Sequence, residues 1–152
     1  MNSLYFTVGL PRSGKSTCCK DFLDTFDNIA IVCADDIRLA MGHRWNPFVE
    51  PMVNAIKLTM IRTLLYKQDV IVDGTHTTKK SIMELLRINH MARPVYMKTS
   101  AEECKKRAID SKQEDLIPVI ERMDRQLKEW RQSDISDFWR EEALKTNFEI
   151  RD

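Results

Sequence analysis

Residues 9–16 read GLPRSGKS, which satisfies the pattern G-x-x-x-x-G-K-[ST]. Glycines let such a loop curl so that its backbone N–H groups point at the phosphates of a nucleotide. The lysine of this pattern reaches the β- and γ-phosphates, and the hydroxyl that follows it binds Mg²⁺. We therefore predict a site for ATP and Mg²⁺, with Lys15 on the phosphates and Ser16 on the metal. The predicted nucleotide-binding residues are Gly9, Pro11, Arg12, Ser13, Gly14, Lys15, Ser16 and Thr17, which we call the P-loop.

The elements on either side of the P-loop fit this prediction. Residues 4–8 form a short apolar run that stops at Gly9, as a buried strand does. After the loop, apolar side chains recur at steps of three and four up to Phe26, which is typical of an amphipathic helix. The unpaired N–H groups at the start of that helix would then face the phosphates. Arg12 either points toward the γ-phosphate or the acceptor, or is simply solvated.

The rest of the chain alternates strands with helices. Strands are predicted at residues 29–33, 70–72 and 94–98, and helices at residues 50–66, 79–91, 101–110 and 117–130. Continuous apolar strands indicate a parallel sheet that is covered on both faces. We predict one α/β domain over residues 1–152, with the three-layer P-loop NTPase fold, four to five parallel strands flanked by helices, and a helical lid. Ser100 and Glu103 have capping-box spacing. A final helix at 133–144 and an edge strand at 147–150 are left open.

Composition narrows the class of protein. The chain has 24 basic and 23 acidic residues and a net charge of +1, so contacts with nucleic acid would have to be local. The four cysteines show no C-x-x-C spacing and are read as reduced, mostly buried thiols. We find neither a signal peptide nor an apolar run near the roughly 20 residues of a membrane span. We expect a soluble cytoplasmic protein without a membrane partner, and a homo-oligomer stays open.

Residues 34–38 read ADDIR and follow the second predicted strand. A carboxylate at the end of a strand beside the P-loop lies in the crevice where open α/β sheets bind ligands. There it can accept the proton of a hydroxyl that attacks phosphorus. Asp35 and Arg38 are three residues apart, so on a helix they face the same side. In the alternative interpretation, Asp35 or Asp36 merely caps the helix that follows.

Three segments, GLPRSGKST, ADDIR and VIVDGTH (residues 70–76), resemble those of small P-loop kinases related to the 5′-hydroxyl polynucleotide kinase domain. The resemblance implies that Asp35 is the general base and that Arg38 clamps a phosphate of the acceptor. It also implies that Asp73 holds a Mg²⁺-bound water and that Thr75 contacts the acceptor's phosphate. The family has its aspartate directly before the threonine, whereas Gly74 intervenes here. We interpret His76 as a polar loop residue rather than a catalyst.

The same resemblance implies a lid cation that screens charge on the transferred phosphoryl group. The family's arginine near a Val-Pro motif is missing from residues 104–123. Arg107 is the predicted catalytic cation, with Lys112, Arg122 and Arg125 as alternatives, although lysine lacks the planar two-pronged contact of arginine. A cationic stripe of this kind is also typical of the solvated face of a helix.

The predicted function is transfer of the γ-phosphate of ATP to a hydroxyl, with the 5′-hydroxyl end of DNA or RNA as first choice. Basic contacts to that end would come from Arg38, Arg44 and residues 79–80. Trp45 and Phe48 either stack on a terminal base or plug the core below their loop.

Two alternatives remain for the function. One is a small-molecule kinase that acts on a nucleoside, nucleotide, sugar or antibiotic in a pocket enclosed by residues 44–50. The other is a nucleotide-dependent switch module without an acceptor, which is disfavoured because the sequence has no N-K-x-D-type guanine motif.

Overall fold

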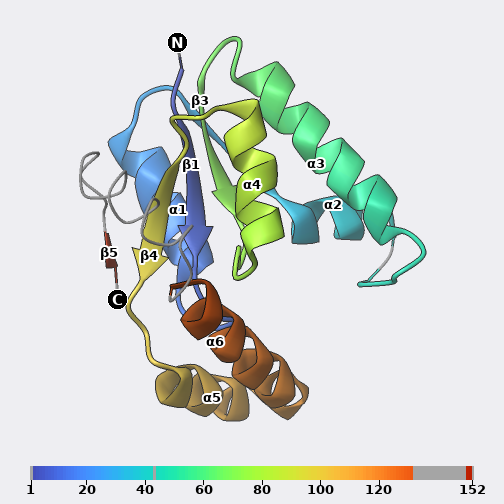
Figure 1. Ribbon diagram of the computed structural model, residues 1–152, viewed down its shortest axis with the longest axis vertical. Coiled ribbons are helices and arrows are strands. Elements are labelled where there is room, and N and C mark those ends of the chain that lie inside the picture. Colours follow the sequence, from blue (N-terminus) through green and yellow to red (C-terminus); the bar gives the residue numbers. More distant parts are fainter. Residues whose placement is uncertain (1, 43, 132–149, 152) are drawn as a thin grey trace.

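The computed structural model describes residues 2–42, 44–131 and 150–151, and these form a parallel sheet with helices packed against it (Figure 1). The order of strands in the sheet is β2-β3-β1-β4-β5. The strands are β1 (Leu4–Val8), β2 (Ile29–Cys33), β3 (Asp69–Asp73), β4 (Arg93–Met97) and β5 (Ile150–Arg151). The predicted α/β fold is confirmed. The helix predicted at 133–144 lies outside the described residues, as does the edge strand at 147–150 except for Ile150, which belongs to β5.

Each of the strands β1 to β4 is followed by at least one helix, as the alternating pattern predicted. The helices are α1 (Lys15–Thr25), α2 (Ala34–Ala40), α3 (Glu50–Leu64), α4 (Lys79–Ile88), α5 (Ala101–Asp110) and α6 (Ile117–Arg131), with a 3₁₀ turn, η1 (Glu114–Leu116), before α6. Helix α4 was predicted to reach residue 91 but ends at Ile88. The reason is Asn89, which is extended and whose side-chain oxygen accepts the N–H of Met91 at 2.9 Å, so the chain turns there.

Alternate side chains of the strands enter two separate cores. Phe6, Val8 and Val72 lie in the larger core, with side chains from α3, α4, α5 and α6. Ile71 and Val95 point to the opposite face and pack with side chains of α1. This period of two on strands covered from both sides explains why each strand reads as a continuous apolar run. The result is the expected three-layer arrangement.

Helices α5 and α6 form a pair beyond the carboxyl ends of β1 and β4, the edge of the sheet that also bears the P-loop (Figure 1). The Ser100 hydroxyl accepts the N–H of Glu103 at 3.2 Å and so caps α5 as predicted. The Glu103 carboxylate turns elsewhere and accepts a hydrogen bond from Nε of Arg107 at 3.1 Å. The second half of the predicted capping box is therefore replaced by a contact with a candidate site residue.

Two further expectations concern the thiols and the membrane. All four cysteines are free thiols, and Cys18, Cys19 and Cys104 are buried, as the prediction of reduced thiols requires. Among the described helices, none is both long and apolar enough to cross a bilayer.

Candidate active site

The P-loop joins β1 to α1 through two residues in the left-handed region. Arg12 has φ 67° and Gly14 has φ 97°. Gly14 is the N-cap residue of α1, and no side chain caps the first N–H groups of this helix. These N–H groups are therefore left to bind an anion at the positive end of the helix.

Two side chains lie inside the loop. Lys15 Nζ donates to the carbonyl oxygen of Leu10 at 2.6 Å, which holds the ammonium over the loop. Burial lowers the pKa of Lys15, and the negative charge of Asp73 opposes this shift. The Ser13 hydroxyl is buried and has no hydrogen-bond partner among the described residues. A Cβ at Gly9 would lie 2.7 Å from that hydroxyl, so glycine is needed where the loop closes on itself.

The P-loop is joined to the end of β3 through Ser16. The Ser16 hydroxyl donates to Oδ2 of Asp73 at 2.8 Å. No cluster of three or more histidine, cysteine or acidic residues forms a metal site in the described part of the chain. Mg²⁺ usually keeps several waters and takes only one or two protein ligands beside substrate phosphates. The pair of Ser16 and Asp73 fits that donor set.

A buried polar layer supports the loop from below. The Gly74 N–H donates to the Thr7 hydroxyl at 3.1 Å, and this hydroxyl donates to the Gly74 carbonyl at 2.8 Å. His76 Nδ1 lies 2.7 Å from the carbonyl oxygen of Thr7, and because a carbonyl only accepts, Nδ1 carries the proton. Burial lowers the pKa of His76 to about 4, so the ring is neutral at pH 7. His76 is thus not an ordinary loop residue but a buried support of the P-loop.

The packing of His76 also explains why Gly74 separates Asp73 from Thr75. A Cβ at Gly74 would lie 2.7 Å from the imidazole ring. The Thr75 carbonyl accepts the N–H of Gly9 at 3.0 Å, so this segment is tied to the start of the P-loop. The departure from the family's pattern thus accompanies a histidine beneath the loop.

The first turn of α2 brings Asp35 and Arg38 together, as their spacing predicted. Arg38 NH1 donates to Oδ1 of Asp35 at 2.6 Å. Its Nε donates to Oε2 of Glu50 at 2.8 Å, and its NH2 donates to Oε1 of the same carboxylate. The N-cap position of α2 is Cys33, so neither Asp35 nor Asp36 caps this helix. The capping alternative is therefore wrong, and the side chain of Asp35 is 83% exposed toward solvent.

These elements surround one cavity of about 950 Å³. It is bounded by the P-loop, the first turn of α2, the segment after β3, and the facing sides of α5 and α6. The carboxylates in its lining are Asp35 and Asp73, and the cations are Arg12, Lys15, Arg38, Lys57, Arg107 and Arg122. The cavity is therefore cationic although the whole chain has a net charge of only +1. Thr75, Pro11, Gly14, Ser16 and Thr17 also line it.

Comparison with solved structures shows which known folds this chain resembles. The chain is similar to a chain of the Pnkp1/Rnl/Hen1 RNA repair complex, with 27% identity and a TM-score of 0.77 over 86% of this chain and 45% of that one. A second structure of the Pnkp1/Rnl/Hen1 complex matches with 28% identity and a TM-score of 0.64 over 70% of this chain and 39% of that one. The chain has a polynucleotide kinase-like P-loop fold.

A third, more distant similarity supports the fold only. Shikimate kinase from Acinetobacter baumannii in complex with shikimate matches with 18% identity and a TM-score of 0.55, over 94% of this chain and 81% of that chain. This chain spans less than half the length of the two RNA repair chains, at 45% and 39%. Neither a protein-family model nor a curated protein matches it.

The four residues predicted as candidates for the lid cation lie on or beside α5 and α6. Arg107 NH1 donates to the carbonyl oxygen of Arg12 at 3.2 Å, which ties α5 to the P-loop. Arg122 lines the same cavity from α6. Of the other two candidates, Lys112 is exposed after α5, and Arg125 lines a separate groove on α6. The geometry therefore favours Arg107 and Arg122 over Lys112 and Arg125.

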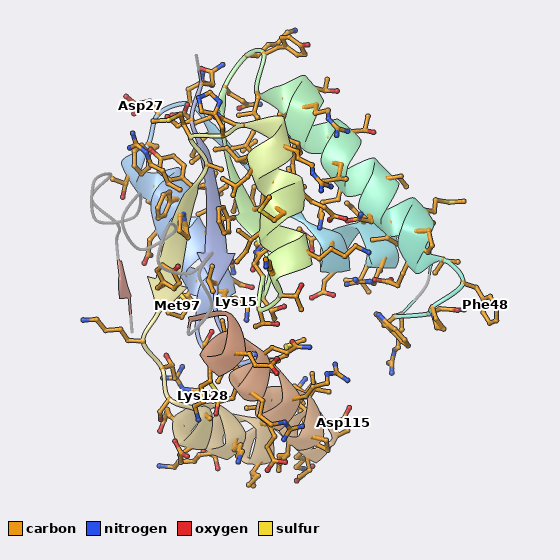
Figure 2. The ribbon with its side chains drawn as sticks, viewed as in Figure 1. Lys15, Asp27, Phe48, Met97, Asp115 and Lys128 are labelled. Carbon is orange, nitrogen blue, oxygen red and sulfur yellow. The ribbon has the colours of Figure 1, made fainter. Side chains whose placement is uncertain are left out.

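The segment between α2 and α3 is open to solvent. Trp45 lines the cavity while its residue is 67% exposed, and Phe48 is 92% exposed. Figure 2 shows Phe48 pointing away from the body of the molecule, while Lys15 lies at the carboxyl edge of the sheet. The interpretation that these aromatic rings plug the core is wrong. Arg44 and the two lysines at 79–80 are exposed and do not line the cavity.

Sequence reasoning missed two charged residues of the site, Glu50 and Lys57. Glu50 begins α3 and has no motif around it, and only the fold brings it to Arg38. Lys57 had a detectable signal. It interrupts the apolar stripe of α3 midway between Val53 and Ile61, where a charged residue is unexpected.

Proposed function

We propose that this chain transfers the γ-phosphate of ATP to a hydroxyl, and that the acceptor is the 5′-hydroxyl end of DNA or RNA. The observation that carries the proposal is a shared cavity. The P-loop lines one part of it, and Asp35 with Arg38 lines another. A donor phosphate and a carboxylate able to take a proton would then meet in one space, as phosphoryl transfer to a hydroxyl requires.

The residues suggest how the step proceeds. The acceptor oxygen attacks the γ-phosphorus and forms a new O–P bond, while the bond from γ-phosphorus to the β–γ bridging oxygen breaks and ADP takes its electrons. The hydroxyl proton passes to Oδ2 of Asp35, because Oδ1 already accepts a hydrogen bond from Arg38. Lys15 and Arg107 would stabilise the charge that spreads over the transferred group.

Mg²⁺ bound beside Ser16 and Asp73 would neutralise the phosphates and help to align them. The hydrogen bond between these two residues brings their oxygens together, which supports this assignment. The role of this pair as metal site is part of the proposal.

Two observations support a nucleic-acid end over a small acceptor. Residues 44–48 do not close over the cavity, since Trp45 and Phe48 are mostly exposed. An acceptor could therefore extend out past this segment. The likeness at 27% identity to a chain of an RNA repair complex points the same way.

A small-molecule kinase remains the second candidate. The cavity of about 950 Å³ lies within the range of about 300–1,000 Å³ that is usual for small ligands. Much of that volume would be taken by ATP, so the acceptor space left is modest.

The test is transfer of labelled γ-phosphate from ATP to a panel of 5′-hydroxyl DNA and RNA oligonucleotides, mononucleotides, nucleosides and sugars. Label in the oligonucleotides, lost in a Lys15→Met variant, is the expected result. Label only in nucleosides or sugars would establish the small-molecule alternative. Slow hydrolysis with no labelled acceptor would favour the switch module.

A further inference from the structure

Lys57 is a charged residue within the buried stripe of α3. Val53 and Ile61, four residues before and after it, are 1% and 0% exposed. Residues four apart lie on the same face of a helix, so Lys57 shares the face that packs on the body of the protein. Its side chain lines the cavity. Burial lowers the pKa of Lys57, and the charge of Glu84 opposes this shift.

The ammonium of Lys57 lacks a direct partner. Within the described residues it forms no hydrogen bond and no ion pair, although Glu84, Arg38 and Glu50 are near enough to affect its charge. Glu50 is already engaged by two nitrogens of Arg38. The Glu84 oxygens lie 3.4 and 3.5 Å from the Asn54 amide nitrogen and not within ion-pair distance of Lys57. The Lys57 nitrogen is not a buried atom and its side chain lines the cavity, so the ammonium is available to an anion that enters there.

Arg38 is in the opposite situation. Its Nε and NH2 hold the carboxylate of Glu50, and its NH1 holds Asp35. Three of the five N–H donors of Arg38 are thus taken, and the group of Asp35, Arg38 and Glu50 carries a formal charge of −1, which disfavours a further phosphate. Lys57 has no carboxylate within ion-pair distance among the described residues. It lies on α3, which packs against α2, and so on the α2–α3 side of the cavity, whereas Arg107 contacts the P-loop from α5.

We propose that Lys57, rather than Arg38, makes the charged contact with a phosphate of the acceptor, and that Arg38 is a positioning residue that orients Asp35. Lys57 is then the residue that makes the enzyme prefer an acceptor with a phosphate near the attacked hydroxyl. The inference rests on the proposed kinase function of this cavity. It gives Lys57 the phosphate contact that the resemblance implies for Arg38, and it leaves Arg38 the role of holding Asp35.

The two roles predict different kinetic changes. Lys57→Met keeps most of the length of the side chain and removes its charge, so the KM for a nucleoside 3′-monophosphate should rise about 10- to 100-fold with kcat little changed. The KM for the matching nucleoside, which carries no phosphate, should stay as in wild type. Lys57→Arg, which keeps the charge, should show a smaller rise in the KM for the nucleoside 3′-monophosphate than Lys57→Met. Arg38→Met should lower kcat for both acceptors without a selective change in KM.

Structural effects are separated by controls. Lys67→Met changes an exposed lysine outside the cavity and should behave as wild type. The Tm of Lys57→Met should be equal to or above that of wild type, because an unpaired, half-buried charge has been removed. Calorimetry with the nucleoside 3′-monophosphate and a non-hydrolysable ATP analogue provides a readout other than turnover, and binding should be weaker in Lys57→Met.

The outcomes distinguish this inference from the proposed function. The inference is wrong if Lys57→Met changes the KM for both acceptors equally, or for neither. It is also wrong if only Arg38→Met raises the KM for the phosphate-bearing acceptor. If wild type phosphorylates the nucleoside 3′-monophosphate but no oligonucleotide, the polynucleotide assignment fails while the role of Lys57 stands. A wild type that labels only phosphate-free acceptors, or none of those tested, contradicts both.

Discussion

The Ser16 hydroxyl donates a hydrogen bond to Oδ2 of Asp73 at 2.8 Å, although the two residues are 57 positions apart in the sequence. The bond crosses from the first turn of α1 to the end of β3. Because β3 is paired with both β1 and β2, the same strand end lies between the P-loop and the start of α2. Asp73 is therefore placed to act on both halves of the cavity.

From this contact we expect Ser16→Ala and Asp73→Asn each to raise the Mg²⁺ concentration for half-maximal transfer by about tenfold or more, because each removes one oxygen ligand or its orienting partner. The double variant should be less affected than the product of the two single effects, since the residues act as a pair. Magnesium titrations of transfer measure both. Thr25→Val, at the far end of α1, is the control. Independent, multiplicative effects would show that the two residues do not share a metal.

The proposed general base, Asp35, can be tested against its neighbour Asp36 in the same turn of α2. Asp35→Asn should leave ATP affinity nearly unchanged and reduce transfer by about 10²- to 10⁴-fold, because the amide cannot accept the hydroxyl proton. Asp36→Asn is the matched control and should transfer at close to the wild-type rate. ATP binding by calorimetry and transfer in single-turnover conditions separate the two steps. Equal loss in both variants would contradict the assignment of Asp35.

The candidate lid arginines differ in their contact with the cavity. Arg107→Ala should lower kcat by about 10²-fold, because it removes one preorganised donor from the transferred group, with a smaller effect on ATP affinity. Arg125→Ala should have little effect on kcat, since Arg125 lines the separate groove on α6. Steady-state kinetics with varied ATP would show the difference. A larger loss in the Arg125 variant would assign the lid cation to Arg125 and not to Arg107.

His76 predicts a pH dependence of folding. Its pKa is about 4 in the folded protein and about 6.5 when unfolded, so the unfolded state binds more protons between these values. The free energy of unfolding should therefore fall as the pH drops from 6.5 toward 4, by up to roughly 3 kcal/mol from this residue.

Urea denaturation at pH 7.5 and pH 5 measures this effect. His76→Asn, which tolerates the left-handed backbone at φ 43°, should be less stable at pH 7.5 but should lose less stability between the two pH values. His90→Asn changes an exposed histidine and is the control. The same pH dependence in all three proteins would show that other groups are responsible.

Much of the fold could be predicted because its signals are local. Buried parallel strands read as continuous apolar runs, and the strand, loop and helix around Gly14 follow one another directly in the sequence. The alternation of strands and helices then predicted a sheet with helices on both faces. The predicted end of α4 was wrong because the side chain of Asn89 competes for backbone hydrogen bonds. The periodicity of apolar residues does not detect this competition.

The site was predicted only where a motif spans a few residues. The contact between Asp35 and Arg38 follows from helical spacing, but the contact between Arg38 and Glu50 joins two helices that are separated by residues 41–49. The burial of His76 depends on its contacts with Thr7 and Phe6 of β1. Such contacts depend on tertiary packing, and nothing local in the sequence specifies them.

Positive charge is concentrated in the cavity. Six cations and two carboxylates give its lining a formal charge of +4, although the whole chain has a net charge of only +1. A polyanion would be steered with one end toward the mouth of the cavity. Because salt screens charges over about 10 Å, nucleotides farther along the strand would feel little of this attraction. Capture of a strand should therefore depend on its first nucleotides and gain little from a longer one.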